Sequence, residues 1–147
     1  MTFYKKSLKS IIEALRKKGY KATPQRIAIC KYALQNPTHP TAKTIYQKVR
    51  EEYPTISLAT VYKTLKVLKE LDLIQELPFS QGQIRYDPNM TPHINLVCSK
   101  CSTIIDLDDP AVQSIIKRIA DAKKFQVNGQ RLDIYGICER CKKGKLQ

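Results

Sequence analysis

The 147-residue sequence has no apolar run long enough to span a bilayer, and residues 1–6 lack the apolar segment of a signal peptide. It also has no internal repeat and no low-complexity tract. We therefore expect a protein without a membrane partner, built as one ordinary domain or two small ones. A cytoplasmic location follows, where cysteine thiols stay reduced and available to metal.

Acidic residues are scarce, since 13 Asp and Glu stand against 26 Lys and Arg for a net charge of +13. Residues 1–89 carry 16 basic and 7 acidic side chains, a net charge of +9, whereas residues 90–147 carry 10 and 6, a net charge of +4. This excess in the first part favours a polyanionic partner, most simply nucleic acid. A basic, solvated surface is the alternative that charge alone leaves open.

Four of the five cysteines form two Cys-x-x-Cys pairs, Cys98 with Cys101 and Cys138 with Cys141, and 36 residues separate the pairs. Two such pairs are typical of a four-thiolate zinc site, whose closed tetrahedron holds structure and leaves no open position for catalysis. We therefore expect structural Zn²⁺ in a protein that is not an enzyme. The alternative is a thiol-disulfide oxidoreductase that uses the pairs as redox-active dithiols or disulfides.

Apolar periodicity predicts four short helices in the first part of the chain. Leu8 begins a pattern at i, i+3, i+4 and i+7, and Gly19 follows the basic last turn of that helix. Thr23, Thr41 and Ser57 are helix-capping residue types that stand at the start of the next three patterns. The first part therefore reads as a small helical bundle.

Two strand-like stretches, 74–77 and 83–86, flank a turn rich in Pro, Ser, Gln and Gly and predict a β-hairpin. Helices followed by a hairpin are typical of a winged helix-turn-helix, in which the fourth helix enters the DNA major groove. The outer face of that helix and the hairpin carry side chains that suit bases and phosphates. The predicted DNA-binding residues are Thr60, Tyr62, Lys63, Lys66 and Arg85.

Among these residues, Tyr62 and Lys63 are predicted to set specificity, whereas Lys66 and Arg85 are predicted to meet phosphates. Exposed lysines are common on helices, and Tyr62 could instead cover a neighbouring helix. An ordinary solvated helix face is therefore the alternative that periodicity leaves open.

Residues 87–92 contain two prolines among turn formers and predict a linker between domains 1–86 and 93–147. The second domain contains strand-like stretches and a helix that begins after Asp109 and has one apolar face. The strands are predicted at 94–98, 104–107 and 131–137, and the apolar face is Val112, Ile115, Ile116 and Ile119. The predicted fold class is α+β, with an N-terminal winged helix-turn-helix domain and a small C-terminal α/β domain that zinc stabilises.

A second candidate site contains no sulfur. The only two histidines are His39, in a loop of the helical part, and His93, after the linker. Asp87 ends the hairpin, Asn95 shares a strand face with His93, and Asp106 lies on the neighbouring strand. Such nitrogen and oxygen donors favour Fe²⁺ or Mn²⁺. Scattered surface residues that never meet are the alternative, because sequence separation alone does not bring them together.

The sequence resembles the ferric uptake regulator superfamily over nearly its whole length. The resemblance rests on ordered motifs: Gly19-x-x-x-Thr23-x-Gln-Arg26, His39-Pro-Thr-Ala, Ser57-x-Ala-Thr-Val-Tyr62-x-x-Leu65, Arg85-Tyr-Asp87, Cys98-x-x-Cys101 and Leu132-x-Ile-Tyr-Gly-x-Cys138-x-x-Cys141. The resemblance implies a homodimeric, metal-dependent repressor that binds double-stranded operator DNA. It also implies an α/β dimerisation domain with structural zinc and a regulatory metal between the domains.

Within that superfamily, the aspartates at 87 and 106 and the Ile-Tyr-Gly-x-Cys ending resemble the peroxide-sensing branch. In that branch, Fe²⁺ at the regulatory site reacts with hydrogen peroxide, a histidine ligand is oxidised and repression is lost. His39 and His93 fall on the positions that carry this chemistry. An iron or manganese uptake regulator without peroxide sensing, and a metal-independent DNA-binding member with a vestigial site, are the alternatives.

The sequence departs from the family pattern at two positions. Asn95 stands where the family usually has the second histidine of a His-x-His motif, and an amide oxygen is a weaker and harder ligand than imidazole. Gln130 stands where many members carry a further histidine, so an additional sensory site there is not expected. Cys30 lies on an apolar helix face and is interpreted as core packing.

Overall fold

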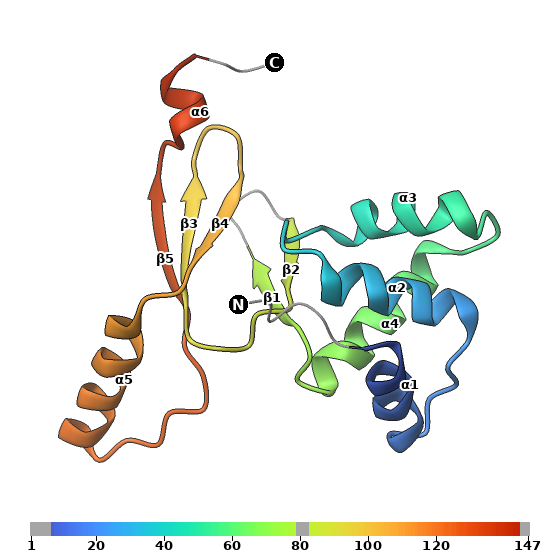
Figure 1. The fold of residues 1–147 in the computed structure, drawn as a ribbon, viewed down its shortest axis with the longest axis horizontal. Helices are drawn as coiled ribbons and strands as arrows, with labels where there is room; N and C mark the ends of the chain where they lie inside the picture. The colour runs from blue at the N-terminus through green and yellow to red at the C-terminus, as the bar shows by residue number, and fades with distance from the viewer. Residues whose placement is uncertain (1–6, 79–82, 145–147) are drawn as a thin grey trace. The chain divides into compact units, whose positions relative to one another are not determined.

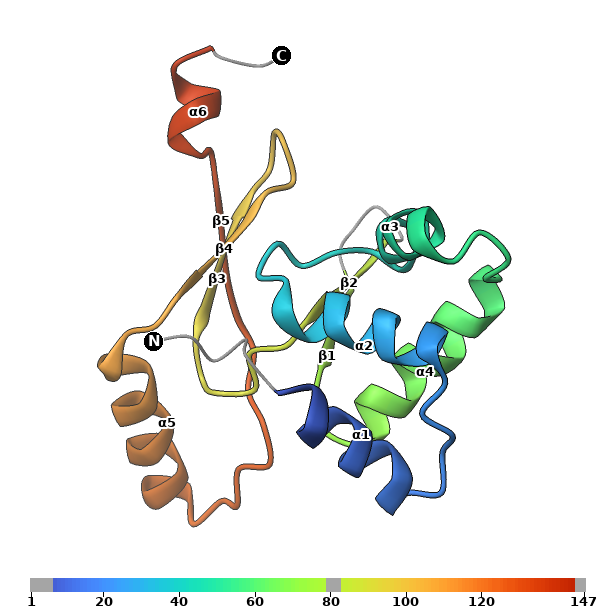
Figure 2. The same ribbon diagram turned by 45° about the vertical axis from the view of Figure 1, so that its right-hand side comes forward.

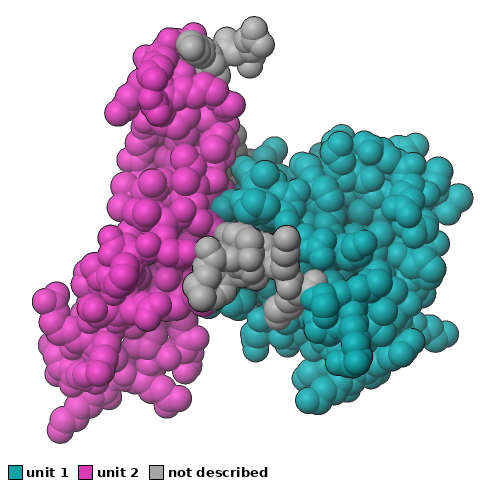
Figure 3. Space-filling view, viewed as in Figure 1, with its two compact units in different colours: residues 1–90 teal, residues 91–147 magenta. Residues whose placement is uncertain are grey.

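The computed structural model describes residues 7–78 and 83–144. The chain forms two compact units, residues 1–90 (unit 1) and 91–147 (unit 2), coloured separately in Figure 3. The division falls inside the predicted linker, residues 87–92. Among the described residues, no helix combines the length and the apolar character needed to cross a bilayer.

In its described residues, unit 1 contains four helices followed by a two-stranded sheet (Figure 1). Its elements are α1 (Leu8–Lys17), α2 (Pro24–Gln35), α3 (Ala42–Glu52), α4 (Leu58–Glu70), β1 (Gln75–Pro78) and β2 (Ile84–Asp87). The order and number of these elements confirm the predicted winged helix-turn-helix.

The predicted caps define where three of these helices begin. The side chains of Thr23, Thr41 and Ser57 each accept a hydrogen bond from the backbone N–H three residues further on, at 3.1–3.2 Å. Each bond satisfies a donor that the first turn of a helix leaves unpaired. Gly19 follows α1 with a φ of +81°, a left-handed conformation that favours glycine.

The core of unit 1 contains side chains from all four helices. Ile11, Ile29, Ile45 and Leu65 are each at most 1% exposed. Cys30 lies in the same cluster, and burial raises the pKa of its thiol to about 12. The interpretation of Cys30 as a packing residue is therefore confirmed.

The strands β1 and β2 pair antiparallel, with Gln75 opposite Asp87. The predicted turn between them falls largely on residues 79–82, which lie outside the described residues. The N–H of Tyr86 donates to the carbonyl of Pro40 at 3.0 Å, and Thr41 forms an isolated bridge with Arg85. These bonds fix β2 against the loop that precedes α3.

Unit 2 contains a three-stranded sheet with the order β4-β3-β5. Its elements are β3 (Ile94–Cys98), β4 (Ile104–Leu107), α5 (Pro110–Lys123), β5 (Leu132–Gly136) and α6 (Glu139–Lys142). The central strand β3 pairs antiparallel with β4 and parallel with β5. The parallel pair needs a long connection, which β4 and α5 supply.

The predicted apolar face of α5 is not buried within the chain. Val112 is buried, but Ile115 and Ile119 are 45% and 55% exposed. Figures 1 and 2 show α5 extending beyond the three-stranded sheet, and only its first turn contributes to the core. Apolar periodicity identified the helix correctly but not its packing partner, because periodicity records that a face is apolar and not what covers it.

Replacing Ser57 with alanine should lower the free energy of unfolding by about 1 kcal/mol, because the N–H of Thr60 loses its acceptor. Ser57→Asp is the matched control, since an aspartate side chain caps a helix equally well. Urea unfolding of the zinc-loaded protein, followed by circular dichroism, measures both. Equal loss in the alanine and aspartate variants would contradict a capping role.

Candidate metal centres

The four predicted zinc cysteines lie together in unit 2. Cys98 ends β3, Cys101 follows in a tight turn, Cys138 precedes α6 and Cys141 lies within it. The sulfur atoms are 3.8 Å apart for Cys98 and Cys141 and 3.7 Å apart for Cys101 and Cys138, and all four lie within 4.8 Å of one another. A tetrahedron with zinc–sulfur bonds of about 2.3 Å has sulfur–sulfur edges of about 3.8 Å. The cluster therefore fits zinc.

Backbone hydrogen bonds hold this cluster. The N–H of Cys98 donates to the carbonyl of Thr103, and the N–H of Ser102 donates to the carbonyl of Cys98, both at 2.9 Å. The N–H of Ser99 donates to the carbonyl of Gly136 at 2.8 Å and joins the first pair to β5. The two Cys-x-x-Cys pairs therefore lie at the same end of the three-stranded sheet, where β3 and β5 finish.

Hydrogen bonds also favour the thiolate form of two of these cysteines. The N–H of Cys138 donates to the sulfur of Cys98 at 3.3 Å and lowers the pKa of that thiol. Hydrogen bonds from the hydroxyl and backbone of Thr103 lower the pKa of Cys101 to about 5. Burial raises the pKa of Cys141 to about 12. A zinc ion would hold all four cysteines as thiolates, because its charge offsets their mutual repulsion and the burial of Cys141.

The cysteines are all free thiols in the structure. Sulfur separations of 3.7–3.8 Å are far from the disulfide bond length of about 2.05 Å. The geometry favours metal binding over the disulfide alternative.

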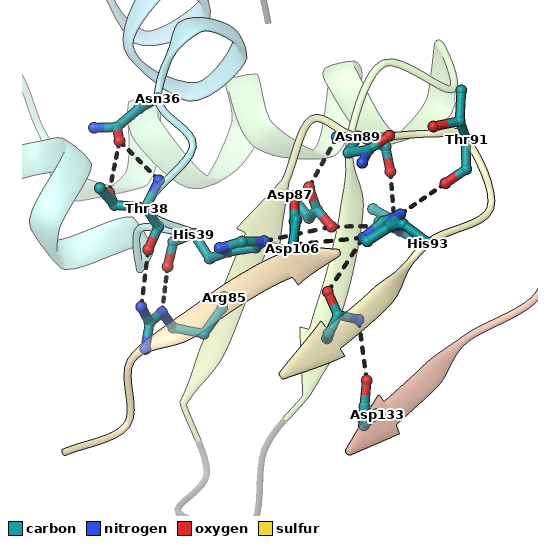
Figure 4. A network of polar contacts seen from close by, with 12 residues as sticks. Asn36, Thr38, His39, Arg85, Asp87, Asn89, Thr91, His93, Asp106 and Asp133 are labelled. Carbon is teal, nitrogen blue, oxygen red and sulfur yellow. Dashed lines mark hydrogen bonds and ion pairs between the residues drawn. The ribbon is translucent and has the colours of Figure 1, made fainter. Parts of the chain in front are cut away.

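Unit 1 places His39 beside Asp87, in what we call the His39 cluster (Figure 4). The Nε2 atom of His39 lies 3.5 Å from Oδ2 of Asp87, and both side chains are buried. His39 has a φ of +54°, a left-handed conformation that costs a non-glycine residue energy. Asp87 is held in turn, since its Oδ1 accepts a hydrogen bond from the N–H of Asn89 at 2.8 Å.

Arg85 holds the loop that carries His39. Its guanidinium donates to the carbonyl of His39 and, at 3.0 Å, to the carbonyl of Thr38 (Figure 4). Charge-assisted hydrogen bonds of this kind are stronger than neutral ones and offset the cost of the left-handed conformation. The structure thus gives Arg85 a structural role that sequence reasoning missed. Its predicted phosphate contact stays a prediction.

Unit 2 places His93 beside Asn95 and Asp106, in what we call the His93 cluster. The Nε2 atom of His93 lies 3.2 Å from Oδ1 of Asn95 and 3.6 Å from Oδ1 of Asp106. Its other ring nitrogen, Nδ1, lies 2.7 Å from the carbonyl oxygen of Thr91 (Figure 4). His93 lies one residue before β3, and its ring contacts the side chain of Asn95, so the two side chains lie on the same side of the chain.

Sheet register explains this arrangement and reveals a residue that sequence reasoning missed. Asn95 on β3 is directly opposite Asp106 on β4 and Asp133 on β5. The Nδ2 atom of Asn95 donates to Oδ1 of Asp133 at 3.0 Å. The sequence indicates that Asp133 lies in a strand, but not that it meets Asn95. The parallel register of β3 and β5 shows that contact.

The Asp133 side chain is a carboxylate under ordinary conditions. Burial alone would raise its pKa, but hydrogen bonds from Arg131, Asn95 and Tyr135 and the charge of Arg131 together lower it. The Nη2 atom of Arg131 lies 2.6 Å and the hydroxyl of Tyr135 lies 3.3 Å from Oδ2 of Asp133.

The predicted DNA-binding face lies on the outside of α4. Tyr62 is 48% exposed, and Lys63 and Lys66 are exposed as well. Thr60 is half-buried, and its hydroxyl lies 2.9 Å from that of Ser57 at the start of the helix. Three of the predicted residues are therefore accessible on one face, whereas Thr60 is partly committed to the helix cap.

A winged-helix unit followed by a small α/β unit with a four-sulfur metal centre defines a class of proteins that combines a DNA-binding fold with a metal-binding one. The sequence matches the ferric uptake regulator family over residues 17–135. The peroxide-responsive repressor PerR of Staphylococcus epidermidis is 37% identical over 135 residues, covering 92% of this chain and 90% of the relative. The chain belongs to the ferric uptake regulator family.

Solved structures agree with this assignment. The peroxide stress regulator of Campylobacter jejuni is similar with a TM-score of 0.73 and 34% identity, covering 89% of this chain and 98% of that protein. The ferric uptake regulator of Vibrio cholerae is similar with a TM-score of 0.72 and 28% identity, covering 87% and 99%. The shared architecture extends over both units.

Replacing Cys138 with serine should release zinc and unfold unit 2, because three thiolates do not close the tetrahedral site and the unit buries few apolar side chains. Cys30→Ala is the matched control, since Cys30 belongs to unit 1 and should leave one zinc ion per chain in place. Elemental analysis and thermal unfolding measure both effects. Stoichiometric zinc in the Cys138 variant would contradict the assignment.

Proposed function

We propose that this chain is a metal-dependent, peroxide-responsive transcriptional repressor that binds operator DNA in the cytoplasm. The observation that carries the proposal is the pair of sulfur-free clusters, one on each unit: His39 with Asp87, and His93 with Asn95 and Asp106. Imidazole, carboxylate and amide donors suit Fe²⁺ and Mn²⁺, whereas the separate four-cysteine centre suits zinc.

We propose further that one regulatory Fe²⁺ or Mn²⁺ ion is shared by the two clusters. Each cluster alone offers two or three side-chain donors, which is fewer than the five or six that these metals commonly take. An ion that needs donors from both units would restrict the motion of one unit against the other. In a homodimer, that restriction would set the spacing of the two DNA-binding helices, which operator half-sites demand.

The signal is proposed to be hydrogen peroxide. A bound Fe²⁺ ion supplies reactivity toward peroxide that Mn²⁺ does not share under the same conditions. His39 and His93 are the nitrogen donors, so an oxygen atom added to either ring would change the donor set and weaken the hold of the clusters on the ion. The relatives of this chain that are named for peroxide response support this part of the proposal.

The DNA contact is proposed to run along the outer face of α4. Unit 1 carries 16 basic and 7 acidic residues, a net charge of +9, which attracts the phosphate backbone. Exposed Tyr62 and Lys63 are the proposed base contacts, Lys66 and Arg85 the proposed phosphate contacts, and Thr60 a further contact near the start of the helix.

The partner of unit 2 is proposed to be a second copy of the chain. Ile119 on α5 is 55% exposed, and Ile134 and Tyr135 on β5 are 48% and 62% exposed. Large apolar side chains gathered on one small unit are typical of surfaces that a partner covers. A homodimer would also supply the two DNA-binding units that an operator with two half-sites requires.

The proposal predicts that Fe²⁺ and Mn²⁺ both promote DNA binding, but that hydrogen peroxide abolishes binding only in the iron form. The probe is a DNA fragment selected from a random pool by the manganese-loaded protein. Fluorescence anisotropy measures affinity before and after peroxide, and mass spectrometry of the peptides that contain His39 and His93 should then show one added oxygen. His39→Ala is the control and should bind DNA weakly with either metal, while keeping its zinc.

Three outcomes would assign a different function. Metal-dependent binding that peroxide leaves intact would identify an iron or manganese uptake regulator. Binding that chelators leave intact would identify a metal-independent DNA-binding protein. Loss of binding with oxidised cysteines and unmodified histidines would point to thiol chemistry at the zinc site.

Lys66→Ala should weaken DNA binding, with the slope of log affinity against log salt falling by about one, because one phosphate contact is lost. The unfolding free energy should stay nearly constant, since Lys66 is exposed. Lys117→Ala, which removes an exposed lysine of unit 2, controls for net charge. Equal salt slopes for Lys66→Ala and Lys117→Ala would rule out the α4 contact.

Arg85→Ala should instead lower the free energy of unfolding by about 2 kcal/mol, because the carbonyls of Thr38 and His39 lose a charged donor.

A further inference from the structure

Asn95 occupies the centre of a row of polar side chains that crosses the sheet of unit 2. Its neighbour on β4 is Asp106 and its neighbour on β5 is Asp133. An asparagine side chain has one oxygen, which accepts, and one nitrogen, which donates. The Asp133 carboxylate only accepts, so an amide that contacts it must donate its nitrogen to that side and turn its oxygen away.

The structure settles which side receives the donor. The Nδ2 atom of Asn95 lies 3.0 Å from Oδ1 of Asp133, and Oδ1 of Asn95 lies 3.2 Å from Nε2 of His93. Reversing the amide would bring its oxygen against the carboxylate oxygen, and two acceptors at that distance repel each other. The Asp133 carboxylate therefore fixes the orientation of the amide.

Asp133 is itself held in place. Arg131 contacts its Oδ2 atom at 2.6 Å, and the hydroxyl of Tyr135 donates to the same atom at 3.3 Å. The other oxygen, Oδ1, is the one that Asn95 uses. The three partners divide the two carboxylate oxygens between them, so the side chain has one preferred rotamer.

The orientation of His93 completes the arrangement. Its Nδ1 atom lies 2.7 Å from the carbonyl oxygen of Thr91, which only accepts, so Nδ1 carries a proton and donates it to that oxygen. The other ring nitrogen, Nε2, faces Oδ1 of Asn95 at 3.2 Å and Oδ1 of Asp106 at 3.6 Å. Two acceptor oxygens and a ring nitrogen therefore face one position that suits a cation, which is a proton on Nε2 or a metal ion that displaces that proton.

We infer that Asp133 is a positioning residue that makes Asn95 an oxygen donor to the regulatory metal ion. The inference rests on the proposed function, because it assumes that the His93 cluster binds Fe²⁺ or Mn²⁺. Without Asp133, the amide would turn and donate its nitrogen to Nε2 of His93, and that hydrogen bond would occupy the lone pair that the metal needs. A hydrogen-bonded partner behind a ligand commonly changes metal affinity 10–100-fold, in order of magnitude.

The test is a double-mutant cycle read by calorimetry of Mn²⁺ binding to the zinc-loaded, full-length protein. Asp133→Ala should weaken Mn²⁺ binding roughly 10–100-fold when Asn95 is present. In an Asn95→Ala background, the same change should alter affinity by less than about threefold, because no amide remains to be oriented. Asp133→Asn keeps an acceptor oxygen and should lose less affinity than Asp133→Ala.

The cycle separates positioning from the effect of a nearby charge. An equal loss in both backgrounds would mean that Asp133 acts through its charge alone, and it would overturn the inference. Unchanged affinity in Asp133→Ala would overturn it too. Zinc content and thermal unfolding identify a variant that has not folded. If Asp133→Ala fails that check, the inference requires Asp133→Asn to bind Mn²⁺ measurably more weakly than the parent protein. In the Asn95→Ala background, Asp133→Asn must then have no such effect.

A second measurement detects the orientation of the Asn95 amide through the ring nitrogen of His93 that it faces. The ¹⁵N resonance of His93 Nε2, recorded on zinc-loaded protein before manganese is added, should shift in Asp133→Ala toward the value of an unprotonated ring nitrogen that accepts a hydrogen bond. No shift would overturn the inference, whatever the calorimetry shows. A parent protein that binds no Mn²⁺ beyond its zinc would instead overturn the proposed function, and the two failures are thereby distinguished.

Discussion

The parallel pairing of β3 with β5, closed at one end by four cysteine sulfurs, is the interaction on which unit 2 depends. The pairing aligns Asn95 with Asp133 and carries Cys98 alongside Gly136, just ahead of Cys138. A unit with so few buried apolar side chains does not hold a parallel strand pair by packing alone. The zinc centre therefore maintains the register, and the register in turn places the oxygen and nitrogen donors of the His93 cluster.

In unit 1, the short strand β2 serves three purposes in consecutive residues. Arg85 reaches the carbonyls of the loop that carries His39, Tyr86 joins the core and pairs with Pro40, and Asp87 contributes the carboxylate beside His39. Since consecutive strand residues point to opposite faces, Arg85 and Asp87 lie on the same side as each other. The hairpin that the fold would otherwise use only as a wing is thus also the scaffold of a candidate ligand set.

Local features of this fold were predictable from the sequence, and non-local ones were not. The caps at Thr23, Thr41 and Ser57 depend on bonds to residues three positions away, so their signals lie in short stretches of sequence. Asp133 lies 38 residues from Asn95, and nothing local reveals that the two meet. The cysteine pairs are the exception, because zinc chemistry constrains their spacing strongly enough for a distant contact to be inferred.

Two features depend on tertiary packing that the sequence does not show. Arg85 is predicted to meet phosphates because it is basic and lies in the hairpin, and the structure adds a second role, since its guanidinium donates to backbone carbonyls. The helix α5 is predicted to have one apolar face, and the structure adds that Ile115 and Ile119 of that face are exposed within the chain. In both cases the residue type was interpreted correctly, but the partner it contacts depends on tertiary packing.

The position of Cys30 has a consequence for selectivity. A thiol reacts with oxidants as the thiolate, and a pKa of about 12 in a sealed apolar core leaves almost none of that form at neutral pH. The four other cysteine sulfurs are gathered in one centre that suits a metal ion, and a bound zinc ion would hold them as ligands. The five cysteines would then offer an oxidant little free thiolate, which would leave the imidazoles of the chain as the reactive sites.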